Sequence, residues 1–419
     1  MDNQVQTKVC ITFDDQPYVL KSFEKPGEVA LYYGFVPIES PRLNQKDWQR
    51  ARTISPTNIS NIKNRPGKGP QKEYELGLRV EEKCALFRKY LDELTNLPHP
   101  LGIYYTLPLR GDTRTKVKGQ LHQLEILDSR LPIADVTILK TAIEILKEEG
   151  HENVHVLINS VGDDQSKTRF RRELIEYFKT HIESIPRKAQ GLIKDNVFTL
   201  MHYDDEALHS LQAQAPNSLD FLDETSRQRF MDVLEFLETL NIPYQINPTL
   251  VGDTYSEHTI FEIRNITEDG TKGELLARGG RYSDIAKRCG SKKDVPSVGI
   301  TLGYTPAQKT KREKYIFQRV DKPVCYFMQL GPMAKLKSLH IIESLRKAEI
   351  PLRHMLCKEK CFGQMSIAKQ IQLPYLIIMG QKEALDNCVL VRNVTTYSQD
   401  IVPVDHLPNY MKKLVKRTS

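Results

Sequence analysis

The sequence of 419 residues contains no apolar run near the roughly 20 residues that a helix needs to cross a bilayer. Its first residues show neither the basic flank nor the apolar stretch of a secretory leader. The seven cysteines are scattered and include no Cys-x-x-Cys pair, which argues against a disulfide framework and against a zinc site. We therefore expect a cytoplasmic protein that does not interact with membranes and holds no structural metal.

Glycine-rich phosphate loops are also missing. Neither G-x-G-x-x-G nor G-x-x-x-x-G-K-S/T follows an expected strand of the C-terminal part, which weighs against a nucleotide-binding Rossmann domain there. The composition is that of a globular protein, with 40% hydrophobic and 27% charged residues. A chain of this length predicts two domains, and its formal charge of +7 favours an anionic partner.

Two segments show a strong helical repeat of apolar residues. Residues 134–150 place Ile138, Ile145 and Leu146 on one side and end at a glycine. Residues 219–243 repeat apolar residues at the same spacing and end at a proline. We predict a helix with one buried side in each segment.

A third stretch combines strands with paired glycines. Leu275 to Ala277 and Val298 to Leu302 read as strands, and the Gly279-Gly280 pair between them predicts a tight turn. Arg281 and Tyr282 follow the glycines and place a planar cation and a phenol at the strand end. From these residues alone, a turn carrying a surface arginine remains an alternative.

Taken as a whole, this stretch resembles a motif of histidyl-tRNA synthetases, which are class II aminoacyl-tRNA synthetases. Ala277 to Ser283 is similar to A-G-G-R-Y-D, with Arg278 inserted and Ser283 in place of the aspartate. Pro296 to Gly303 is similar to P-A-V-G-F-x-x-G. The family continues with Glu-Arg, where this chain has Thr305-Pro306.

The resemblance extends over about residues 25–413 and implies an α+β fold. Residues 1–310 are expected to form a class II synthetase-type core, a mainly antiparallel sheet with flanking helices. A helical insertion is expected at about 163–222. Residues 323–419 resemble the α/β anticodon-binding domain that several of these synthetases share.

The resemblance also implies substrate-binding residues. Arg79 and Glu81 match the family's R-P-E-G-T, in which the glutamate would hold the amino group of an amino acid. Lys83 replaces the small threonine and would bring a long cation into the pocket. Alternatively, Glu81 and Glu82 are acids favoured in a first helical turn.

The second motif is retained in outline. Arg110 falls on the arginine that grips the ATP α-phosphate, Asp112 on a glutamate, and Gln123 on the glutamine that faces the amino acid. A substrate carboxylate of the family becomes Leu127. The intervening loop carries cations suited to phosphate or RNA contact, although a solvated hairpin tip is equally consistent with them: Arg114, Lys116 and Lys118.

Two arginines of the family are absent. The motif L-V-R-G-L-D-Y-Y, whose arginine stabilises the charge that develops during adenylation, reads here as Leu250 to Tyr255 with Gly252 near the missing arginine. Pro306 stands where the last ATP-binding arginine is expected. Arg110 and Arg281 remain as candidate catalytic residues, and Tyr255 and Tyr282 as substrate-binding residues.

Three functions follow from this pattern. The first is a protein that binds tRNA or a related ligand without efficient aminoacylation. The second is a divergent histidine–tRNA ligase that uses ATP and Mg²⁺, with Arg114, Arg278 or Lys83 supplying the missing charge. The third is a regulatory subunit akin to that of ATP phosphoribosyltransferase, which residues 323–419 disfavour.

The expected partners are tRNA and a second copy of the chain. The C-terminal domain and the basic helix with Arg169, Arg171 and Arg172 suit a phosphate backbone, although such a helix face is often simply solvated. A homodimer is expected because Val36 to Ile38 would otherwise be exposed on a sheet edge. Residues 51–72 are expected to form a loop that could cover the site.

Overall fold

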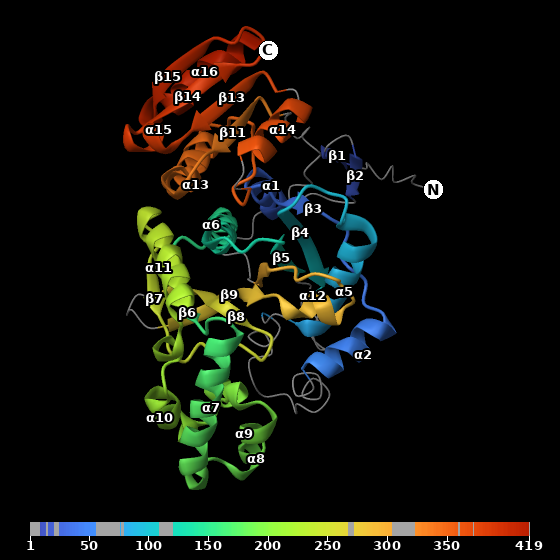
Figure 1. Cartoon of the computed structure of the whole chain (residues 1–419), viewed down its shortest axis with the longest axis vertical. Coiled ribbons are helices and arrows are strands. Elements are labelled where there is room, and N and C mark those ends of the chain that lie inside the picture. Colours follow the sequence, from blue (N-terminus) through green and yellow to red (C-terminus); the bar gives the residue numbers. More distant parts are fainter. Residues whose placement is uncertain are drawn as a thin grey trace.

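Two sheets organise the computed structural model, which describes residues 9–13, 16–20, 25–55, 76, 79–108, 120–266, 272–303, 323–358, 361–371 and 373–418. An eight-stranded sheet forms the core, and a five-stranded sheet forms the C-terminal domain. A separate antiparallel pair is formed near the N-terminus by β1 (Val9–Phe13) and β2 (Gln16–Leu20). Figure 1 shows the C-terminal domain at one end of the molecule, the core in the middle and a group of helices at the other end. None of the described helices is long and apolar enough to span a membrane.

The core sheet is mainly antiparallel, as the resemblance implies. Only its outer pairs, β3 with β4 and β6 with β7, run parallel. In spatial order its strands are β3 (Val36–Pro37), β4 (Leu101–Pro108), β5 (Gln120–Leu127), β10 (Ser297–Leu302), β9 (Lys272–Tyr282), β8 (Glu257–Ile266), β6 (Val154–Ser160) and β7 (Tyr244–Ile246).

Three helices cover one face of this sheet, which we call the back face. The long helix α6 (Pro132–Glu148) packs against β10 and β5, and it also contacts α1 (Lys25–Tyr32) and α11 (Glu224–Thr239). Ile138, Ile145 and Leu146 are fully buried, which confirms the predicted inner side of the first helix.

The opposite, front face is covered by α5 (Val80–Lys89), which continues as a π-helical turn at Tyr90–Leu94, together with α2 (Gln45–Ile54) and α12 (Asp284–Arg288). The first turn of α5 is buried, unlike the first turn of a helix on the protein surface. Glu81, Glu82 and Lys83 are all buried although all three are charged. The start of α5 therefore places charged groups inside the molecule.

The paired glycines do not form the predicted turn. Strand β9 runs straight through Gly279 and Gly280 to Tyr282. A Cβ at Gly279 would overlap the carbonyl of Gly299 on β10 and the ring of Phe261 on β8. The glycines thus serve close packing inside the sheet, and the turn prediction was wrong.

Helices fill the region between β6 and β7, as expected for the insertion. It contains α7 (Asp164–Thr180), α8 (Arg187–Gln190), α9 (Leu192–Asp195) and α10 (Glu206–Gln214), joined by short 3₁₀ turns. Phe170, Leu174 and Phe178 of α7 are fully buried in a separate apolar cluster.

The C-terminal domain has the sheet order β12, β11, β13, β14, β15. Its first three strands are parallel and its last two antiparallel. The elements β15, α15 and α16 were not predicted from the sequence. The strands are β11 (Cys325–Gln329), β12 (Leu352–His354), β13 (Tyr375–Met379), β14 (Cys388–Asn393) and β15 (Gln399–Pro403), and the helices are α13 (Pro332–Lys347), α14 (Cys361–Ile371), α15 (Gln381–Leu385) and α16 (Leu407–Thr418).

Ion pairs join the two domains along α6 and α13. Arg346 contacts Glu144 at 2.6 Å and Glu148 at 2.8 Å, and Lys140 contacts Glu343 at 2.5 Å. The apolar cluster of the back face also continues into the C-terminal domain. The interface thus combines apolar packing with partly buried charge pairs.

The edge strand proposed as a dimer contact is covered within the single chain. Val36 is 1% exposed and Ile38 is 7% exposed. The exposed apolar edge on which the dimer prediction rested is therefore absent from the described residues, and the homodimer itself stays a prediction.

Candidate functional site

The front face of the core sheet brings the predicted substrate residues near the start of α5. Gln123 on β5 and Tyr282 on β9 both face this side and are buried. Arg79 is the residue before the first turn of α5, and Glu81 lies within that turn. The structure therefore gathers four of the five predicted substrate-binding residues around one helix start.

A buried ion pair occupies the centre of this region. Lys83 reaches from α5 to Glu125 on β5, and the Tyr282 hydroxyl donates to the other oxygen of the same carboxylate. The Lys83 ammonium lies 5.3 Å from the centre of the Tyr282 ring. Burial holds the pKa of Glu125 above its ordinary value, although Lys83 and Tyr282 act to lower it.

Three side chains of this region carry buried polar atoms without a hydrogen-bond partner among the described residues. Gln123 accepts a hydrogen bond from Thr301 at 3.0 Å, but its amide nitrogen has no partner among the described residues. One carboxylate oxygen of Glu81 is buried and equally unpartnered there. Arg79 contacts Glu82 at 2.5 Å, while its Nε has no acceptor within the part of the chain that the structure describes.

A second cation of the front face is also paired. The Arg278 guanidinium contacts Glu262 on the neighbouring strand β8 at 2.5 Å, and Arg264 contacts the same carboxylate at 2.9 Å. Burial acts to raise the pKa of Glu262, but the two arginines outweigh it and hold the pKa below its ordinary value.

Arg281 points to the back face, because successive side chains of a strand alternate. Its Nε and Nη2 atoms donate to Asp135 of α6 at 2.7 to 2.9 Å, and its Nη1 and Nη2 atoms donate to the carbonyls of Ser129 and Leu131. Burial opposes ionisation of Asp135, but Arg281 and Arg229 outweigh it and hold its pKa below the ordinary value. Arg281 thus fastens β9 to α6.

The segment that lacks the catalytic arginine forms a tight turn. Gly252 has a φ of +66°, and a Cβ there would overlap Ser256 and Ile260. Lys167 of α7 donates to the carbonyls of Thr254 and Ser256 at 3.1 Å. Neighbouring atoms therefore fill the space in which a longer side chain at this position would lie.

Several predicted site residues lie outside the described residues: Arg110, Arg114, Lys116, Lys118, Pro306 and most of the loop at 51–72. Tyr255 is described and packs, partly exposed, against the apolar cluster of the front face. The cations Arg169, Arg171 and Arg172 are exposed on α7. Of these, Arg169 donates to the carbonyl of Phe221 at 2.9 Å.

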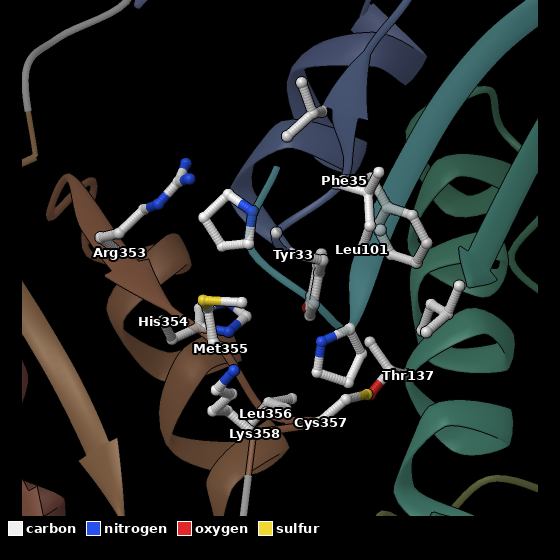
Figure 2. A pocket seen from close by; sticks show the side chains of 16 residues that line it. Tyr33, Phe35, Leu101, Thr137, Arg353, His354, Met355, Leu356, Cys357 and Lys358 are labelled. Carbon is white, nitrogen blue, oxygen red and sulfur yellow. The ribbon is translucent and has the colours of Figure 1, made fainter. Parts of the chain in front are cut away.

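A small hollow lies where the two domains meet, between α1 and β3 of the core and β12 of the C-terminal domain (Figure 2). Figure 2 shows Tyr33 and Phe35 on one side of it and His354 on the other. The hollow encloses about 40 Å³, whereas small-molecule sites usually offer roughly 300 Å³ or more. It is large enough for water but not for an amino acid or a nucleotide.

The described residues do not fit ATP and Mg²⁺ well. Binding a polyphosphate requires cations that can turn toward it, but Lys83, Arg278 and Arg281 each face a carboxylate of this chain. Across the part of the chain that the structure describes, no three His, Cys, Asp or Glu side chains are placed to hold a metal ion.

The acidic partners Glu125, Glu262 and Asp135 were not identified from the sequence. Glu125, Glu262 and Asp135 lie 42, 16 and 146 residues from Lys83, Arg278 and Arg281, respectively, so no local pattern links these pairs. In β5, Glu125 stands between Leu124 and Ile126 of the segment QLHQLEIL, and these neighbours do not reveal its partner.

Comparisons with known proteins agree with the sequence motifs. Residues 328–414 match the family model described as "Anticodon binding domain". The chain is 29% identical over 358 residues to histidine–tRNA ligase 1 of Shouchella clausii, and the match covers 81% of this chain and 82% of that protein. It is also 29% identical over 354 residues to the histidine–tRNA ligase of Bacillus subtilis, covering 82% of each.

A crystal structure of apo histidyl-tRNA synthetase from S. aureus is similar over 92% of this chain and 93% of that chain, with 22% identity and a TM-score of 0.49. The sequence similarities extend along both domains, and the C-terminal match starts just inside the five-stranded sheet. The chain is a histidyl-tRNA synthetase-like protein with an anticodon-binding-type domain at residues 328–414.

Proposed function

We propose that this protein binds tRNA and does not form histidyl adenylate efficiently. The observation that carries the proposal is the pairing of the core cations. Lys83, Arg278 and Arg281 each contact a carboxylate from a neighbouring strand or helix, and the three carboxylates are almost fully buried. Adenylation needs fixed positive charge around the transferring phosphorus, and these cations are already neutralised.

The tRNA partner is supported by the C-terminal domain and by the relatives. Residues 328–414 match an anticodon-binding family, and the similar proteins are named as histidine–tRNA ligases. Exposed lysines on α16, namely Lys412, Lys413 and Lys416, present positive charge to solvent. Neutralising RNA phosphates in this way releases counterions and gives a salt-dependent affinity.

An active, divergent ligase is the second candidate, since relatives of similar length carry that name. It would require Lys83 or Arg278 to leave its carboxylate, or Arg114 to supply the charge. The cost of separating a buried pair, about 3–5 kcal/mol when one partner is lost, disfavours the first two routes. The regulatory-subunit alternative gains no support from a domain that matches an anticodon-binding family.

Two assays on the full-length protein test the proposal. Transfer of labelled histidine to tRNA should stay at background, while tRNA should bind with an affinity that falls steeply between 50 and 200 mM salt, by roughly 10³-fold or more if about six phosphates are contacted. Efficient transfer of histidine would refute the catalytic part. Binding that does not respond to salt would refute the proposed phosphate contacts.

A further inference from the structure

The Lys83–Glu125 pair is buried beneath the front face of the core sheet. The side chains of Lys83 and Glu125 are 2% and 0% exposed. The carboxylate lies over Gly299 of β10, where any Cβ would overlap it. The chain thus builds a narrow space for a carboxylate and fills the matching cation position with its own lysine.

We propose that the Lys83 ammonium is a built-in ligand in a binding site for small primary ammonium compounds, so that this site is closed in the intact protein and opens when Lys83 is truncated. The proposal does not depend on RNA binding or on adenylation. Glu125 supplies the charge, the Tyr282 ring offers its face to the cation, and the Tyr282 hydroxyl fixes the second carboxylate oxygen.

Neighbouring polar groups indicate a site rather than a simple structural pair. The amide nitrogen of Gln123, two residues along β5 from Glu125, is buried without a partner among the described residues. Gln123 and Glu125 share one face of the strand, because alternate residues of a strand point the same way. A donor is therefore available beside the carboxylate for a polar atom of a ligand, whereas a purely structural ion pair would be expected to leave no buried donor unused.

The test truncates the Lys83 side chain and then adds the missing part of that side chain as a free small molecule. The change Lys83→Ala removes three methylene groups and the ammonium, which together correspond to n-propylammonium. Addition of n-propylammonium at tenfold over its Kd should raise the Tm of this variant by roughly 1–2 °C. The Tm of the intact protein should not change, because its site is already filled.

Three controls separate binding from general salt effects. Lys89→Ala removes a lysine of the same helix whose partner, Glu93, is 58% exposed, so n-propylammonium should not change its Tm. The double variant Lys83→Ala with Glu125→Gln should lose the response, because no buried carboxylate remains. The neutral isostere 1-propanol should stabilise Lys83→Ala far less than n-propylammonium.

The response to pH distinguishes this role from packing. Four elements place groups against Glu125, namely Lys83 of α5, Tyr105 of β4, Tyr282 of β9 and the Gly299 backbone of β10. Two further charged residues, Glu82 and Arg79, lie beside Tyr105. Without Lys83, burial keeps the pKa of Glu125 raised, and a proton competes with the ligand. Below that pKa, binding should tighten by up to about tenfold per pH unit as the pH rises.

If Lys83→Ala does not fold alone, its refolding can be measured with and without n-propylammonium. Lys83→Met, which keeps most of the side-chain volume but not the charge, then shows whether loss of volume prevents folding. Recovery that depends on n-propylammonium supports the site. The proposal is overturned if n-propylammonium stabilises the intact protein as much as the variant. It is equally overturned if Lys83→Ala folds and shows no shift, or if the shift survives Glu125→Gln.

Discussion

The core sheet and the outer helices differ in how their basic side chains are placed. In the core, Lys83 and Arg281 are buried and each meets a carboxylate. On α7 and α16, Arg171, Arg172 and Lys412 are exposed to solvent. The first arrangement cancels charge inside the protein, and the second leaves it for an external anion. Figure 1 places α7 and α16 at opposite ends of the molecule, with the core sheet between them.

This difference separates two activities that a synthetase combines. Catalysis of adenylation depends on cations free to act on the substrate, whereas RNA binding depends on cations on the surface. Our proposal is that this chain keeps the second activity without the first.

Acidification should disturb the core and its border with the C-terminal domain most. Burial lowers the pKa values of His122 and His258 in the core and of His354 on β12 to about 4. A histidine of the unfolded chain binds a proton near pH 6.5, so between pH 6.5 and 4 the unfolded state binds more protons than the folded state. The free energy of unfolding therefore falls as the pH is lowered through this window. Each histidine contributes up to roughly 2–3 kcal/mol.

The single tryptophan provides the measurement, because Trp48 lies on α2 against the front-face cluster. Its fluorescence should report unfolding of the core with a midpoint between pH 6.5 and 4. A core that keeps its native Trp48 signal and its urea midpoint at pH 4.5 would contradict this prediction.

Replacing Arg281 by Met should remove the cation that holds Asp135. Asp135 would stay buried with only Arg229 nearby, and the expected loss is about 3–5 kcal/mol in the free energy of unfolding. Arg288→Ala is the matched control, because Arg288 and Asp284 are about half exposed, and its loss should stay below about 1 kcal/mol. Urea unfolding measures both, and equal effects in the two variants would contradict the assignment.

The interdomain pair should also be sensitive to acid. Lys140 and Lys347 outweigh the effect of burial and lower the pKa of Glu343 to about 2. Its stabilisation is complete above the ordinary value of 4.5 and is lost as the pH falls toward 2. Glu343→Gln should cost roughly 2–3 kcal/mol at neutral pH and remove this part of the pH dependence. An unchanged unfolding curve at pH 7 would show that the pair does not stabilise the interface.

The surface lysines should affect RNA binding but not stability. Changing Lys412, Lys413 and Lys416 to alanine should weaken tRNA binding about tenfold or more and lower the salt slope by up to about three. The free energy of unfolding should change by no more than about 0.5 kcal/mol. The same changes at Lys292 and Lys293, exposed in the loop before β10, serve as the control and should leave the affinity nearly constant.

Local patterns in the sequence predicted helices α6 and α11, because a repeating apolar side determines where a helix forms. They did not predict that β9 passes through Gly279-Gly280, since the need for glycine there comes from the facing residues Gly299 and Phe261. The family resemblance located Gln123 and Tyr282.

The pairing of Lys83 with Glu125 could not be predicted in the same way. The two residues lie 42 positions apart on different elements. Only the folded chain shows that the lysine replacing a small residue meets a carboxylate and is neutralised.

The most direct test of the central claim is histidine-dependent exchange of pyrophosphate into ATP by the purified full-length protein. Because the described core cations are paired with carboxylates, and because Gly252 and Pro306 supply no charge, we expect exchange near background. Exchange within about tenfold of an ordinary synthetase, equivalent to about 1.4 kcal/mol in the barrier, would contradict the account. Arg114, Arg278 and Lys83 would then be the first residues to mutate, and the one whose loss abolishes exchange would be the substitute cation.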